Sequence, residues 1–260
     1  MCNHLTTVSL KVSDIRFSYG KKETLKGIDL ELQPSQILGI LGPNGSGKTT
    51  LLKCINRILV PSQGEILLGD SDISKMSRLD ISKNMSYVPQ NAKLDLCTPT
   101  VFEIVLMGRR PHITWQFGKK DQDIVWKCLD ELGIRHLAAR SFDSLSSGQS
   151  QRVLMARALA QEAKVLLLDE PTSNLDVKYQ RDVMESVRMV VDEKKIGACA
   201  IIHDLDLALR FCDVSVLLNE GRIVCFGRTE DVLTSENIKE VFGVDSCIET
   251  IRGTKHLIVL

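Results

Sequence analysis

The chain has 260 residues, and its 33 Lys and Arg residues balance 33 Asp and Glu residues, so the formal net charge at pH 7 is zero. This balance excludes a global charge that would recruit nucleic acid or an anionic membrane, and we expect no nucleic-acid partner. No apolar run approaches the roughly 18 residues of a membrane-spanning helix, and the N-terminus lacks the basic and apolar regions of a signal peptide, so we expect a soluble cytoplasmic protein.

The eight cysteines are scattered along the chain, and none belongs to a C-x-x-C motif. Cys54, Cys128 and Cys199 lie within apolar patterns. We therefore expect buried free thiols in a reducing compartment rather than a metal site.

The first third of the chain is predicted to consist mainly of strands. Alternating apolar residues indicate short strands at 8–14 and 27–32, on either side of a turn at 20–22. Further strand patterns lie at 37–41, 64–68 and 84–88.

From about residue 99 to 140 the periodicity becomes helical, with one helix opened by Asp121 and closed by Gly133. Helices are then predicted at 149–160, 177–192, 204–211 and from 229 onward, where a polar helix completes the fold, and strands at 165–168, 198–202, 214–218 and 222–226. Such alternation implies an α/β fold with a mostly parallel sheet. We predict a single domain over 1–260, with a core at about 8–90 and 145–260 and a helical insertion at about 91–144.

Residues 42–49 (GPNGSGKT) fit the phosphate-binding pattern G-x-x-x-x-G-K-[ST]. They follow the strand pattern at 37–41 and precede a helix pattern at 49–56, which is the context that phosphate binding needs. Glycines let backbone N–H groups converge on phosphate oxygens, Lys48 adds a charge for the β and γ phosphates, and the Thr49 hydroxyl can ligate Mg²⁺. The alternative is a glycine turn before an ordinary helix.

Two carboxylates, Asp169 and Glu170, end the apolar strand pattern at 165–168. In a protein with a phosphate-binding loop, the Asp at a strand end is the natural partner of Mg²⁺ through water. Glu170 can poise the attacking water as general base. The alternative is an acidic strand end that caps the following turn.

The segment 145–149 (LSSGQ) lies directly before a predicted helix. Serine hydroxyls and the amides of a helix N-terminus can form an anion site, although alone this would be an ordinary N-cap. Its position about twenty residues before the carboxylates makes the segment more specific.

With these motifs in place, nearly the whole chain resembles the ATP-binding subunits of ABC transporters. The resemblance implies a P-loop NTPase core with a mostly parallel sheet, an N-terminal antiparallel β subdomain and an inserted helical subdomain. It identifies 42–49 as Walker A, Asp169 and Glu170 as the end of Walker B, 145–149 as the signature, 173–176 as the D-loop, Gln90 as the Q-loop residue, His203 as the switch histidine and Tyr19 as the aromatic that stacks on adenine.

The same resemblance implies ATP and Mg²⁺ as cofactors and a set of site residues. The catalytic residues are Glu170, His203, Gln90 and Lys48, and those directed at Mg²⁺ are Thr49, Gln90 and Asp169. The residues that contact the nucleotide are Tyr19, Gly42, Pro43, Asn44, Gly45, Ser46, Gly47, Lys48, Thr49, Thr50, Ser146, Ser147, Gly148 and Gln149.

Two of these residues have an alternative interpretation when they are considered without the family resemblance. Tyr19 alone would be a hairpin side chain, and His203 alone could be a core histidine. Ser147 departs from the family signature, which usually reads L-S-G-G-Q, and we expect a modest effect on ATP clamping from this loss of backbone freedom.

In the family, the signature of one subunit covers the ATP that Walker A of the other subunit holds, so we expect a homodimer or a paired heterodimer. The resemblance also implies a separate membrane permease, an extracytoplasmic binding protein and a peripheral place on the cytoplasmic face of the membrane. The alternatives are a soluble ABC protein acting on ribosomes or DNA, which usually carries two cassettes or a long insertion, and a regulatory module, which should have lost Glu170 or His203.

The segment 108–112 (GRRPH) resembles a stretch in the ATPases that serve iron-chelate, haem and cobalamin importers. We therefore expect a metal-chelate cargo. Zinc and manganese importer ATPases carry a similar segment and remain an alternative. A purely structural interpretation of the segment is a helix end capped by Gly108.

Overall fold

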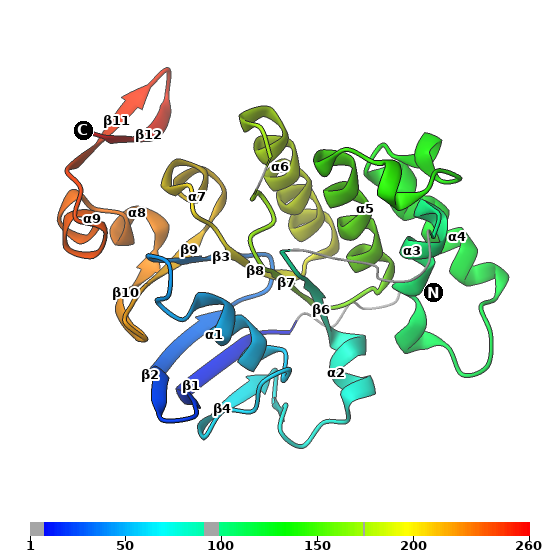
Figure 1. Cartoon of the computed structure of the whole chain (residues 1–260), viewed down its shortest axis with the longest axis horizontal. Coiled ribbons are helices and arrows are strands. Elements are labelled where there is room, and N and C mark those ends of the chain that lie inside the picture. Colours follow the sequence, from blue (N-terminus) through cyan, green and yellow to red (C-terminus); the bar gives the residue numbers. More distant parts are fainter. Residues whose placement is uncertain (1–7, 91–98, 174) are drawn as a thin grey trace.

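The computed structural model describes residues 8–90, 99–173 and 175–260. Figure 1 shows a central sheet with a second sheet on one side and a group of helices on the other. Within the described residues, no helix has both the length and the apolar character needed to cross a membrane.

The central sheet has six strands in the order β10-β9-β3-β8-β7-β6. They are β3 (Ile37–Leu41), β6 (Met85–Val88), β7 (Val165–Leu168), β8 (Gly197–Ile201), β9 (Val214–Asn219) and β10 (Arg222–Arg228). All neighbours pair in parallel except β9 and β10. Every residue of β3, β7 and β8 is buried, as expected for parallel strands covered on both faces. The predicted mostly parallel sheet is confirmed.

The strand order brings the sequence motifs to one edge. Because the strands from β9 to β6 run parallel, the loops that leave their carboxyl ends lie along the same side of the sheet. The loop 42–49 follows β3, His203 follows β8, Asp169 follows β7 and Gln90 follows β6. Four neighbouring strands therefore deliver their functional candidates to one place.

The second sheet is antiparallel, with the order β2-β1-β4-β5. Its strands are β1 (Leu10–Tyr19), β2 (Lys22–Leu32), β4 (Gln63–Leu68) and β5 (Ser71–Asp72). The hairpin strands β1 and β2 are longer than predicted, and the turn between them is shorter. The register shifts near Asp14, whose φ is 44°, interrupt the alternation from which the strand ends were predicted.

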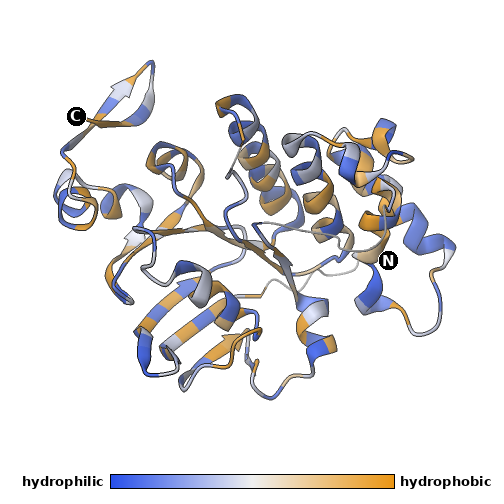
Figure 2. Ribbon diagram, viewed as in Figure 1, coloured by the Kyte–Doolittle hydropathy of each residue, from blue (hydrophilic) through white to orange (hydrophobic). Residues whose placement is uncertain are grey.

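Two hydrophobic cores lie on the two faces of the central sheet. In β3, Ile37 and Leu41 belong to the core under the helices, whereas Leu38 and Ile40 belong to the core shared with the antiparallel sheet. Helix α1 (Lys48–Ile55) joins the second core, and α5 (Ser147–Ala160), α6 (Val177–Lys194) and α7 (Leu205–Phe211) join the first. Figure 2 shows the central strands as a continuous hydrophobic band between these layers.

Short helices fill the region between β6 and β7, as the helical periodicity predicted. They are α3 (Val101–Met107), α4 (Lys119–Glu131) and three 3₁₀ turns, Arg110–His112, Arg135–Leu137 and Phe142–Ser144, all before α5. A further helix, α2 (Arg78–Asn84), precedes β6 and was not predicted. The face of α3 formed by Val101, Ile104 and Val105 is buried against α5. The predicted start of this insertion, residue 91, lies outside the described residues.

The C-terminal end differs from the prediction. The polar segment from Thr229 forms two helices, α8 (Thr229–Val232) and α9 (Ser235–Phe242), and the chain continues into a hairpin of β11 (Ser246–Ile251) and β12 (Thr254–Val259). This hairpin was missed because most of its side chains are at least partly exposed and its turn, Arg252–Gly253, is not one of the common turn pairs. Leu257 is buried, and its backbone N–H donates to Asp206 of α7 (3.1 Å).

The thiols expected to be buried are buried. Cys54, Cys128 and Cys199 all lie in the hydrophobic cores. Burial raises the pKa of Cys54 and Cys199 to about 12 and that of Cys128 to about 11. These thiols therefore remain protonated packing groups at neutral pH.

The segment 108–112 closes the C-terminal end of α5. A Cβ atom at Gly108 would lie 2.2 Å from the carbonyl oxygen of Arg157, so only glycine permits this approach. The Arg109 side chain is buried, and its Nη1 donates to the carbonyl oxygen of Ala160 (2.6 Å). His112 Nε2 contacts the carbonyl oxygen of Gln161 (2.7 Å). These bonds satisfy carbonyls that a helix end leaves without intrahelical partners.

Two carboxylates compensate the charge of Arg109. Its Nε donates to Asp121 Oδ1 (3.0 Å) and its Nη1 to Glu162 Oε2 (2.7 Å). Hydrogen bonds from the backbone of Gly118 and from Arg109 hold the pKa of Asp121 below its ordinary value. A cation at a helix C-terminus is also favoured by the helix dipole. The sequence feature that suggested a cargo class thus fixes the packing of α3, α4 and α5.

We predict that Arg109→Met lowers the free energy of unfolding by about 2–4 kcal/mol, because it leaves the buried carbonyl oxygen of Ala160 and the partly buried carboxylate of Asp121 without their donor. Arg110→Met is the matched control, since Arg110 is exposed, and should change stability by less than about 0.5 kcal/mol. Urea unfolding followed by circular dichroism measures both values. Equal losses from the two variants would contradict the structural role of Arg109.

Candidate active site

The loop 42–49 has backbone conformations that glycine favours. Gly42, Gly45 and Gly47 have φ angles of 142°, 81° and 109°. A Cβ atom at Gly42 would lie 2.0 Å from the carbonyl oxygen of Leu218, so this position excludes any side chain. The loop is anchored further where the N–H of Gly221, in the turn after β9, donates to the carbonyl oxygen of Ser46 (3.0 Å).

Lys48 places its ammonium at the centre of this loop. The side chain is buried, and Nζ donates to the carbonyl oxygens of Gly42 (2.7 Å) and Pro43 (2.9 Å). Burial lowers the pKa of Lys48, while the nearby charges of Glu170 and Asp169 oppose this effect. A cation held by carbonyl dipoles in such a place favours an anionic ligand, because a ligand charge would compensate its desolvation.

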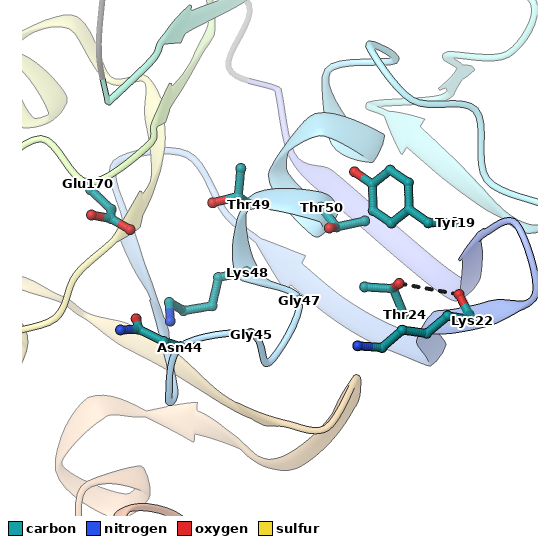
Figure 3. Close-up of a pocket in the computed structure, with 10 residues that line it drawn as sticks. All are labelled: Tyr19, Lys22, Thr24, Asn44, Gly45, Gly47, Lys48, Thr49, Thr50 and Glu170. Carbon is teal, nitrogen blue, oxygen red and sulfur yellow. Dashed lines mark hydrogen bonds between the residues drawn. The ribbon is translucent and has the colours of Figure 1, made fainter.

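A cavity of about 290 Å³ lies beside the loop, and Figure 3 shows the side chains around it. It is lined by Tyr19, Lys22, Thr24, Asn44, Gly45, Gly47, Lys48, Thr49, Thr50 and Glu170. Tyr19 lies at one end, 52% exposed, with its ring edge-on against Phe17 at a centroid distance of 4.8 Å. Glu170 lies at the opposite end, with the loop and Lys48 between them. The space therefore offers an aromatic surface, then backbone amides and a cation, then a carboxylate.

Both oxygens of Asp169 have a hydroxyl donor. Thr49 Oγ1, in the first turn of α1, donates to Asp169 Oδ1 (3.0 Å). Tyr87 Oη, on β6, donates to Asp169 Oδ2 (2.7 Å). Burial and the adjacent Asp169 raise the pKa of the Tyr87 phenol, so the hydroxyl remains a donor. The buried carboxylate is consequently oriented by two different elements of the fold.

Both oxygens of Glu170 are also held. Gln90 Nε2 donates to Oε2 (2.5 Å), and His203 Nε2 lies 2.8 Å from Oε1. The backbone of Glu170 is in the left-handed region, with a φ of 53°. A non-glycine residue held in this conformation is characteristic of functional sites, where the surrounding contacts offset the strain.

The donor set fits Mg²⁺ only if a nucleotide completes it. Thr49 provides a hydroxyl and Asp169 a carboxylate, the oxygen ligands that Mg²⁺ prefers. Among the described residues, no three or more His, Cys, Asp and Glu side chains form a group that could hold a metal ion. Further ligands would therefore come from phosphate oxygens and water, as is usual for Mg²⁺ bound with a nucleotide.

The serine-rich segment does not reach this cavity. Ser146 is the N-cap of α5, where its Oγ accepts from the N–H of Gln149 (3.4 Å) and its own N–H donates to Gln149 Oε1 (3.2 Å). Ser146 and Ser147 are exposed, and Gly148 packs against the ring of Tyr179 on α6. None of Ser146, Ser147, Gly148 and Gln149 is among the residues that line the 290 Å³ cavity.

The segment 173–176 connects Glu170 to α6. Ser173 Oγ donates to the carbonyl oxygen of Glu170 (3.0 Å), and Asp176 is the N-cap residue of α6. Asn174 lies outside the described residues. The hydrogen bond of Ser173 keeps the start of this segment beside Glu170.

Sequence reasoning missed three residues of this region. Lys22 and Thr24 line the cavity because β2 begins at Lys22, which pairs with Tyr19, so the predicted strand start at 27 hid them. Tyr87 was missed because a single aromatic residue in a strand carries no motif. The feature that could have identified Tyr87 is its place in the strand pattern just before Gln90, because that strand could lie beside the one that leads to Asp169.

Comparisons with known proteins show the family to which the chain belongs. The family model described as "ABC transporter" matches residues 25–173. An ABC transporter ATP-binding protein of Methanocaldococcus jannaschii is 43% identical over 96% of this chain and 97% of its own length. A hemin import ATP-binding protein of Pseudomonas fluorescens Pf-5 is 37% identical over 96% of this chain and 99% of its own.

The fold is also that of solved ABC proteins. A structure described as a metal-chelate type ABC transporter in an inward-facing conformation has a TM-score of 0.86 and 31% sequence identity, covering 97% of this chain and 98% of the other. The chain belongs to the ABC transporter family, as one of its ATP-binding proteins.

Proposed function

We propose that this chain is the ATPase subunit of an importer and that its ATP hydrolysis drives uptake of haem or another metal chelate through a separate membrane permease. The observation that carries the ATPase assignment is the single cavity that joins Tyr19, the loop 42–49 and Glu170. The cargo class is supported by the hemin-import relative and by the metal-chelate type transporter structure.

In this proposal Tyr19 stacks on adenine, and the amides of 42–49, with Lys48, bind the phosphates. Thr49, Asp169 and Gln90 are directed at Mg²⁺, which when bound supplies charge neutralisation of the phosphate oxygens. Glu170 accepts the proton of the attacking water. The contacts from Gln90 and His203 orient its carboxylate, so the base is already aimed when the nucleotide enters.

The signature residues act on a second copy of the chain. Ser146 and Ser147 are exposed at the N-terminus of α5, and the cavity of the same chain is built without them. Hydroxyl and amide donors at a helix N-terminus suit the γ-phosphate charge of a nucleotide held by the partner. We therefore propose a dimer with two shared sites, in which ATP joins the two copies.

The helical insertion is proposed to contact the permease at the cytoplasmic face of the membrane. It carries exposed apolar side chains, Trp115 at 93% and Met107 at 45% exposure, of the kind that protein interfaces bury. It also follows directly from Gln90, which contacts Glu170. We propose that a change at the insertion reaches Glu170 through Gln90, and that the cargo itself is selected by the permease and an extracytoplasmic binding protein.

We predict that Glu170→Gln keeps ATP binding but lowers turnover at least about 100-fold, because the amide cannot accept a proton from water. The variant should also accumulate as an ATP-bound dimer. Steady-state ATPase rates and size-exclusion chromatography with ATP measure the two effects. Glu249→Gln, in the exposed C-terminal hairpin, is the control and should behave as the parent. Near-normal turnover of Glu170→Gln would remove Glu170 from the role of base.

The cargo proposal is tested with the complete transporter. The chain is purified with the permease encoded beside its gene, placed in lipid vesicles and supplied with loaded binding proteins one at a time. We predict that a haem, ferric-chelate or cobalamin carrier raises ATP turnover several-fold, and that Glu170→Gln transporters do not respond. Stimulation only by a zinc, manganese, sugar or amino-acid carrier would contradict the cargo class and leave the ATPase assignment intact.

A further inference from the structure

Tyr87 makes a contact to Asp169 that none of the sequence motifs indicates. It is on β6, which pairs in parallel with β7 so that Tyr87 is the register partner of Leu167, two residues before Asp169. Its hydroxyl reaches past the end of β7 to Asp169 Oδ2 (2.7 Å). Tyr87 also lines a second cavity of about 380 Å³, together with Met85 and Gln161.

The hydroxyls of Tyr87 and Thr49 bind different oxygens of Asp169. Thr49 Oγ1 donates to Oδ1, the oxygen that Tyr87 leaves available. Two donors on opposite oxygens fix the rotation of a carboxylate, whereas one donor leaves it free to turn. Because Mg²⁺ demands near-ideal octahedral geometry, the orientation of a carboxylate that serves it affects its affinity.

We propose that Tyr87 is a positioning residue for the Mg²⁺–ATP site: its hydroxyl holds Asp169 so that Oδ1 stays beside Thr49. This inference rests on the role proposed above for Asp169. Tyr87 is not among the residues that line the nucleotide cavity, and its hydroxyl donates to Asp169, so we expect its effect to pass through Asp169. Removal of the Tyr87 hydroxyl should weaken binding of the divalent cation and leave the contacts between the protein and the nucleotide intact.

The neighbouring Ser86 provides a matched control. Its hydroxyl lies on the opposite face of β6 and donates to Gln161 Oε1 (2.9 Å). Ser86→Ala therefore removes one buried hydroxyl and one hydrogen bond from the same strand without touching Asp169. A general loosening of β6 would appear in both variants, whereas loss of carboxylate positioning would appear only in Tyr87→Phe.

The test compares Tyr87→Phe, Ser86→Ala and Asp169→Asn in the full-length chain. Binding of a non-hydrolysable ATP analogue is measured without divalent cation, and Mn²⁺ binding to each protein–analogue complex is measured by electron paramagnetic resonance. We expect Tyr87→Phe to weaken Mn²⁺ binding three- to ten-fold, Ser86→Ala to leave it unchanged and Asp169→Asn to weaken it more. Analogue binding without the cation should be the same in Tyr87→Phe and the parent.

Unchanged Mn²⁺ binding in Tyr87→Phe, or an equal loss in Ser86→Ala, would overturn the positioning role while leaving that of Asp169 in place. Unchanged Mn²⁺ binding in Asp169→Asn would instead remove Asp169 from the cation site, and the role of Tyr87 with it. The Mg²⁺ concentration for half-maximal ATPase activity is a second readout and should rise in Tyr87→Phe with the maximal rate retained.

Discussion

The carboxylate pair at the end of β7 is the feature on which the rest of the site depends. Thr49 and Tyr87 hold the two oxygens of Asp169, and Gln90 and His203 hold those of Glu170. These four partners come from α1, from β6 and its end, and from the end of β8. The parallel strand order brings them together, so a shift of any one strand changes the surroundings of this carboxylate pair.

Strand β6 also connects this pair with the helical insertion. Its successive side chains point to opposite faces, so Tyr87 reaches Asp169 while Ser86 reaches Gln161. Gln161 donates in turn to the backbone of Met85 and Ser82, and its carbonyl oxygen contacts His112. With Arg109 closing the end of α5, the insertion and the strand before Gln90 form one connected set of hydrogen bonds. A displacement of the insertion would therefore change the hydrogen bonds that hold β6.

Motifs with fixed spacing predicted the fold class and the cavity residues of the loop 42–49, with Thr50 and Glu170, because each motif combines unusual residue types with a defined strand or helix end. Tyr19 was predicted from the family resemblance. Residues without such a pattern were not predictable. Lys22 and Thr24 depend on the register of a hairpin that contains bulges, and Tyr87 depends on which strands are neighbours. The segment 108–112 was recognised as a family feature, but its physical role, the close approach of Gly108 and the buried charge of Arg109, required the packing of α5.

We propose that one copy of the chain holds half of each catalytic site, with the loop 42–49 of one copy facing the signature of the other. The most direct measurement mixes a Lys48→Ala subunit with a Gly148→Asp subunit, each inactive alone, and follows ATP hydrolysis while subunit exchange is monitored. A shared site predicts that the mixture recovers up to roughly a quarter of the parent activity, since half of the dimers would carry one site without a lesion. No recovery despite proven mixed dimers would contradict the claim.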